Sequence, residues 1–126
     1  MNTKPVRLTK FQRNELYFLL TDIMSEGFDD AGNTLKGYMS DSYGFANKAE
    51  FDAFTEKLGK NLKAPSMVIQ MTVREAHCTW GEFENRYDIE INNSDDANDE
   101  YAKAARQAQE AMRRVVEAFP EETFRA

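Results

Sequence analysis

The spacing of hydrophobic positions predicts three helices, over residues 10–25, 48–58 and 96–119. The first two start with residue pairs typical of a capping box, in which a helix-start side chain and one three residues later bond each other's backbone N–H groups. These pairs are Thr9 with Gln12 and Asn47 with Glu50. The third helix ends before Pro120, which cannot continue a helix. Its apolar stripe is spaced three or four residues apart and consists of Tyr101, Ala105, Ala108, Met112, Val115 and Phe119.

Alternating hydrophobic and polar residues predict a central hairpin of two strands over about 67–92. The apolar members are Met67, Ile69, Met71 and Val73 in the first strand, and Phe83, Tyr87, Ile89 and Ile91 in the second. A link as short as 75–82 favours antiparallel pairing, with one face buried and the other in water. The turn-forming residues 29–33 could join two further short strands within 27–40.

These elements predict one α+β domain spanning residues 1–126, with helices covering a small antiparallel sheet. A chain of 126 residues has the size of a single compact domain. We expect residues 1–8 to form a flexible basic arm and residues 121–126 to form a C-terminal tail. No internal repeat or low-complexity linker divides the chain.

Reactive and metal-binding residue types are scarce. One cysteine excludes an intrachain disulfide, and with one histidine it leaves too few ligands for an ordinary structural zinc site. His77 and Cys78 are neighbours on a predicted strand, so their side chains would point to opposite faces and form no catalytic dyad. The oxygen-rich segments that start at Asp29 and Asn92 lack the glycine and glutamate that a calcium loop needs at its sixth and twelfth positions. No catalytic residue, metal site or cofactor is therefore predicted.

The hydrophobic stretches of the chain are short. None approaches the roughly 20 apolar residues of a membrane span. The N-terminal apolar run, residues 16–20, is shorter than the about 7 to 15 residues of a signal-peptide core. A free cysteine also fits a reducing compartment. We therefore expect a cytoplasmic protein without membrane contact.

Negative charge is concentrated between residues 82 and 100. The chain carries a net charge of −6, and in this segment eight carboxylates accompany a single base, Arg86. On the predicted strand the first four would share one face at steps of roughly 6.6 Å. The last four would lie at the start of the third helix, where the helix dipole favours anions. The eight are Glu82, Glu84, Asp88, Glu90, Asp95, Asp96, Asp99 and Glu100. They form either a solvated face with helix-capping acids or one continuous negative surface.

Basic residues near the N-terminus have the opposite pattern. Lys4, Arg7, Lys10 and Arg13 have no acid among them, and bases at the start of a helix oppose its dipole. The acidic segment of the same chain or of a second copy would compensate them, and so would nucleic-acid phosphate. The acidic net charge and the lack of a wide basic stripe argue against direct binding of nucleic acid.

The leading functional hypothesis is a small acidic, non-catalytic interaction protein that binds a basic surface of a protein partner. A partner that itself binds nucleic acid would make this chain an inhibitor or a loose nucleic-acid mimic, as in phage-type inhibitors of nucleic-acid machinery. The predicted site consists of the eight acids together with Trp80, Tyr38 and Tyr43, which would act as contact anchors if they are exposed.

Two alternatives from other functional classes stay open. One is a small-molecule-binding domain or small enzyme with a pocket between the last helix and the sheet, near Tyr87 and Tyr101. The other is a homo-oligomeric structural protein, for example a homodimer, that uses the face with Met112 and Val115.

Overall fold

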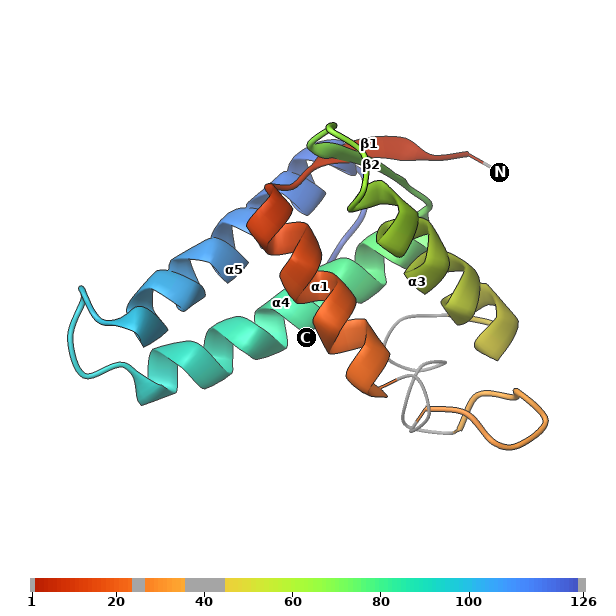
Figure 1. Cartoon of the computed structure of the whole chain (residues 1–126), viewed down its shortest axis with the longest axis horizontal. Coiled ribbons are helices and arrows are strands. Elements are labelled where there is room, and N and C mark those ends of the chain that lie inside the picture. Colours follow the sequence, from red (N-terminus) through yellow and green to blue (C-terminus); the bar gives the residue numbers. More distant parts are fainter. Residues whose placement is uncertain (1, 24–26, 36–44, 125–126) are drawn as a thin grey trace.

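The computed structural model describes residues 2–23, 27–35 and 45–124. In chain order the elements are β1 (Lys4–Arg7), α1 (Lys10–Ile23), α3 (Lys48–Asn61), β2 (Val68–Met71), α4 (Val73–Asn93) and α5 (Glu100–Ala118). Helices α4 and α5 form a long antiparallel pair, α1 and α3 lie against it, and the two strands lie at the end away from the α4–α5 loop (Figure 1). The predicted α+β class is confirmed.

All three predicted helices are present, and each begins at a side chain that caps it. At α1, Thr9 N–H donates to Gln12 Oε1 (2.9 Å), and Gln12 N–H donates to Thr9 Oγ1 (3.1 Å). At α3, the Asn47 side chain accepts from the backbone of Glu50 (3.0 Å). Helix α5 begins later than predicted, because Asp99 is its N-cap. Local sequence signals therefore fix where these helices start.

The prediction of a second hairpin strand is wrong, because Val73–Asn93 forms a helix of 21 residues. A capping box starts it: Glu75 N–H donates to Thr72 Oγ1 (3.2 Å), and Thr72 N–H donates to Glu75 Oε1 (2.9 Å). The predicted alternation requires the side chains of Ile89 and Ile91 to be buried, but both are exposed. Helical spacing of the residues that are buried, rather than alternation, decides the structure here.

Strand β2 pairs instead with the N-terminal strand β1. The pairing is antiparallel and sets Val6 opposite Ile69, and Leu8 N–H donates to the carbonyl oxygen of Met67 (2.9 Å). Val6 and Leu8 are completely buried. The predicted flexible arm over residues 1–8 is therefore wrong for residues 4–8, because these residues supply the second strand of the sheet.

The described part of the segment predicted to hold two extra strands, residues 27–35, forms a tight turn. Asp29 Oδ1 accepts from the backbone of Ala31 (3.0 Å) and of Asn33 (2.9 Å), and Gly32 has φ +84°, a conformation that suits glycine. Phe28 and Thr34 form an isolated bridge. Residues 27–35 thus contain no extended strand, and residues 36–40 of the predicted segment lie outside the described residues.

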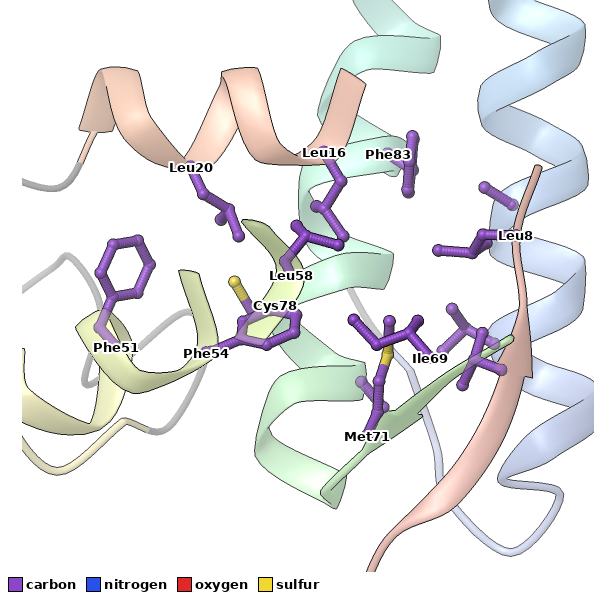
Figure 2. Packing of buried hydrophobic residues seen from close by; sticks show 14 of the residues in the cluster. Leu8, Leu16, Leu20, Phe51, Phe54, Leu58, Ile69, Met71, Cys78 and Phe83 are labelled. Atoms are coloured by element: carbon purple, nitrogen blue, oxygen red, sulfur yellow. The ribbon is translucent and has the colours of Figure 1, made fainter. Parts of the chain in front are cut away.

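The hydrophobic core lies where α1, α3, α4 and the sheet meet (Figure 2). The large buried side chains labelled there come from all of these elements and are Leu8, Leu16, Leu20, Phe51, Phe54, Leu58, Ile69, Met71 and Phe83. Helix α5 contributes mainly small residues, Ala102, Ala105, Ala108 and Ala111, so it can approach α4 closely. Val115 is completely buried in the same face, so the α5 face with Met112 and Val115 packs inside the molecule and is not available for the predicted oligomer.

Arg13, one of the N-terminal bases, is buried at the junction of α1, α3 and β2. Its Nη1 donates to the carbonyl oxygen (3.1 Å) and to Oδ1 (2.6 Å) of Asn61, the last residue of α3. Asn61 Nδ2 donates in turn to the carbonyl oxygen of Val68 (3.0 Å). The C-terminal end of a helix carries partial negative charge. The end of α3, rather than the acidic segment, therefore compensates this base.

We expect Leu8→Ala to lower the free energy of unfolding by about 2–5 kcal/mol, because it removes a fully buried side chain. Urea denaturation followed by far-UV circular dichroism measures this. The control is Arg7→Ala, which changes an exposed side chain on the same strand and should cost less than about 0.5 kcal/mol. Equal, small effects of the two substitutions would mean that the N-terminal residues form an arm after all.

Candidate functional site

The four acids predicted to share a strand face lie on different sides of α4. Glu82 and Glu90 are buried, with exposed fractions of 6% and 5%. Glu84 and Asp88 lie one turn apart on a more exposed side of the helix. The prediction of a common acidic face is wrong, since successive residues of a helix turn by about 100° where those of a strand alternate.

Glu90 is neutralised inside the molecule by Arg86. Arg86 Nη2 lies 2.8 Å from Glu90 Oε1, and Arg86 Nε lies 2.9 Å from Glu15 Oε1. This triad ties α1 to α4. The triad was not predicted from the sequence, because Arg86 and Glu90 lie together only when residues four apart share one side of a helix.

Asp99 has a structural role at the loop between α4 and α5. Its carboxylate accepts from the backbone N–H groups of Ala102 (2.8 Å), Asp95 (2.8 Å) and Asp96 (3.1 Å), and from Ser94 Oγ. These hydrogen bonds, led by the one from Ala102, lower the pKa of Asp99. The carboxylate is therefore committed to shaping the loop and capping α5.

The remaining acids of the segment have no ion pair among the described residues. We call them the outer acids: Glu84, Asp88, Asp95, Asp96 and Glu100. Within this set, partial burial and the nearby Asp88 carboxylate raise the pKa of Glu84. The Asp88 carboxylate therefore disfavours the charged form of Glu84.

A hollow of about 380 Å³ lies between the outer halves of α4 and α5. Tyr87 and Ile91 of α4 and Ala102 and Ala105 of α5 supply its apolar surface. The other lining residues are polar or belong to the loop, and are Ser94, Asp95, Asp96, Ala97, Arg106 and Gln109. The hollow thus combines an apolar floor with carboxylates at its rim.

This hollow differs in place from the predicted pocket between the last helix and the sheet. It is bounded by two helices, and Tyr87 lines it as expected, whereas the half-exposed Tyr101 is not among its lining residues. Arg106 Nη1 donates to the carbonyl oxygen of Ala97 (2.7 Å) and so holds the loop against α5.

Trp80, the one predicted aromatic anchor among the described residues, does not line this hollow. Trp80 is half-buried and stacks on Phe124 of the C-terminal tail, with 6.0 Å between ring centroids. His77 Nε2 lies 3.0 Å from Glu122 Oε1 of the same tail. Tyr38 and Tyr43 lie outside the described residues. Trp80 therefore holds the tail against α4.

Cys78 is completely buried in the core, and burial raises the pKa of its thiol well above the usual value. It is therefore a packing residue and not a thiolate nucleophile. Across residues 2–23, 27–35 and 45–124, no three His, Cys, Asp or Glu side chains gather as ligands for a metal ion. In the same residues no helix has both the length and the hydropathy to cross a bilayer.

No family model, curated protein or solved structure matches the chain. What this surface can bind therefore has to follow from its own chemistry.

We expect Arg86→Met to lower the free energy of unfolding by about 1–3 kcal/mol, because it leaves the buried Glu90 carboxylate without its cation. The double substitution Arg86→Met with Glu90→Leu should recover most of the loss. Arg74→Met is the control, because Arg74 pairs with Glu50 near the surface (3.0 Å). Chemical denaturation of the variants tests this, and an Arg86→Met loss no larger than that of Arg74→Met would contradict it.

We expect Glu84→Gln to raise the free energy of unfolding by about 0.2–0.5 kcal/mol at pH 7, since like charges four residues apart destabilise a helix. Because the pKa of Glu84 is raised in the folded chain, the gain should be complete at neutral pH and vanish below the usual pKa of 4.5. Thermal denaturation from pH 3 to pH 8 measures this. Asp88→Asn should give a similar gain, and the double variant should gain no more than either single one.

Proposed function

We propose that this protein is a small non-catalytic interaction protein that binds a basic segment of a protein partner at the outer halves of α4 and α5. The supporting observation is the hollow there, which has an apolar floor and more acids than bases in its lining, together with outer acids that form no ion pair in the described part of the chain. The binding surface is smaller than the one predicted from the sequence, because Glu82, Glu90 and Asp99 do not contribute to it.

The chemistry of the hollow specifies an amphipathic partner segment. An apolar side chain of the partner would contact Tyr87 and Ile91, since buried apolar anchors supply most interface affinity. Its lysines or arginines would lie near Asp95 and Asp96 at the rim, where complementary charge speeds association and selects the partner. Partial burial and the Asp88 carboxylate raise the pKa of Glu84, and a cation beside Glu84 would also favour its charged form.

The protein would inhibit a partner that uses the same basic segment to bind phosphate groups. Four acids on one strand would already have been spaced too widely to copy a duplex, which carries a charge about every 1.7 Å. The five outer acids are also fewer than the eight acids of the predicted surface. Competition for one basic segment is therefore better supported than mimicry of nucleic acid. A free cysteine supports a cytoplasmic setting for this interaction.

A small-molecule ligand is the second candidate, because a hollow of about 380 Å³ is within the roughly 300–1,000 Å³ of small-ligand sites. The acidic rim would select an aromatic or aliphatic amine. A small aromatic amine that shifts the NMR signals of Tyr87 and Ile91, with no effect of a basic peptide, would favour this candidate over the leading one.

An NMR titration with a synthetic lysine–leucine amphipathic peptide tests the leading proposal. We expect shifts of the amide signals of Tyr87, Ile91 and Ala102, with weaker binding at about 300 mM salt than at about 50 mM. A glutamate–leucine peptide of the same length should cause none. Shifts spread over the whole surface, or equal binding at both salt concentrations, would contradict the proposal.

Two variants, each with three acids neutralised, test where the peptide binds. Asp88→Asn, Asp95→Asn and Asp96→Asn together should weaken peptide binding about tenfold, because each surface ion pair contributes up to about 1 kcal/mol. The control variant removes as much charge from exposed positions elsewhere, by Asp30→Asn, Glu56→Gln and Glu121→Gln. If both variants lose the same affinity, the binding depends on net charge alone and the proposed site is wrong.

A further inference from the structure

The outward side of α1 carries two exposed phenylalanines. Phe11 and Phe18 have exposed fractions of 54% and 65% and, being seven residues apart, lie on the same side of the helix two turns from each other. With Leu19 they line a hollow of about 270 Å³, whose other lining residues are Asn14, Glu15 and Arg86. Exposed aromatics grouped on one helix face are typical of a contact surface.

The charges at the two ends of α1 oppose the helix dipole. The first turn has no acid and contains Lys10, while the last turn has no base and contains Asp22. Both residues are exposed, and neither forms an ion pair among the residues that the structure describes. Each end would be stabilised by a charge of the opposite sign brought from outside.

We infer that this face binds a second copy of the chain, with the two α1 helices antiparallel about a twofold axis near Asn14 and Glu15. Reversal about that axis sets Phe11 opposite Phe18 of the second copy, because the two residues are equally far from it. The same reversal sets Lys10 level with Leu19 of the second copy, three residues or about 4.5 Å along the helix axis from Asp22, so the two oppositely charged ends lie near each other. One symmetric contact thus covers both phenylalanines and compensates both helix ends.

The residues nearest the axis tolerate this arrangement. Asn14 is neutral and exposed. Glu15 would meet its own copy, but its carboxylate is already paired with Arg86 Nε at 2.9 Å. Two copies therefore meet at the axis without a pair of free like charges.

The dimer face and the proposed partner site are separate. The hollow beside α1 and the hollow between α4 and α5 share no lining residue. A contact made mainly by one helix from each copy is smaller than the about 1,200–2,000 Å² of a standard stable interface. We therefore expect monomer and dimer to exchange at micromolar concentrations.

Sedimentation velocity over a concentration series tests the dimer. The average mass should rise from 14.5 kDa toward twice that value, and Phe18→Glu should keep it at 14.5 kDa at every concentration. The control is Val116→Glu, which adds the same charge at an exposed apolar residue of α5 and should dimerise normally. A wild-type chain that stays monomeric at millimolar concentration, or equal loss in both variants, would overturn the inference.

Charge reversal tests the antiparallel arrangement. Asp22→Lys should weaken dimerisation about tenfold or more, because it sets like charges together at both ends of the contact. Adding Lys10→Glu to the same chain should restore it, since opposite charges then meet again. If Asp22→Lys leaves dimerisation unchanged, or if the double variant stays as weak as the single one, the antiparallel arrangement is wrong.

A cysteine at the axis gives an independent readout. Asn14→Cys should form a disulfide-linked dimer under mild oxidation, because the two copies of residue 14 lie close together in the proposed contact. Asn85→Cys, at an exposed position of α4, is the control, and the buried Cys78 does not interfere. Equal cross-linking of the two variants would indicate random collision, and no cross-linking of Asn14→Cys would place the axis elsewhere; either result rejects the inference.

Discussion

The fold depends on the buried Glu75 carboxylate at the start of α4. It accepts the backbone N–H of Thr72 at 2.9 Å and forms an ion pair with Lys57 of α3. This bonding starts a helix directly after β2, so the chain cannot return as a neighbouring strand. The free edge of β2 is then paired by the N-terminal residues, and Val6 and Leu8 become part of the core. One capping interaction thus decides which strand pairs with β2 and where α4 begins.

The same helix decides which charges reach the surface. A strand would have placed its acids in one row, whereas α4 buries Glu90 against Arg86 and leaves Asp88 outside. The acidic surface therefore shrinks, but it gains an apolar floor, since Tyr87 and Ile91 follow the outward side of α4 toward the loop. Charge with apolar area gives a more specific surface than charge alone, because contact area supplies affinity and complementary charge selects the partner.

Local signals in the sequence were sufficient for the three predicted helices and for the first strand, because caps and apolar spacing act within one element. They were insufficient for residues 73–93, where the alternation of Phe83, Ile89 and Ile91 resembles a strand and only Thr72 with Glu75 indicates a helix start. The partner of β2 lies more than 60 residues away in the chain, and no local pattern reports a distant pairing. For the candidate site, the sequence indicated the acidic segment, whereas the apolar floor of the hollow depends on the packing of α4 against α5.

The two candidate surfaces differ in symmetry, and this difference decides what each can bind. A twofold contact sets a surface against itself, so it suits the α1 face, where Lys10 and Asp22 are at opposite ends. It suits the hollow with Asp95 and Asp96 less well, because its lining has two carboxylates and one guanidinium, that of Arg106, so two copies would bring mainly carboxylates together. A different, basic partner is therefore what we propose for that hollow. A dimer through α1 would carry two such hollows, so a partner with two basic segments would bind it more tightly than it binds a monomer, because its second contact is intramolecular.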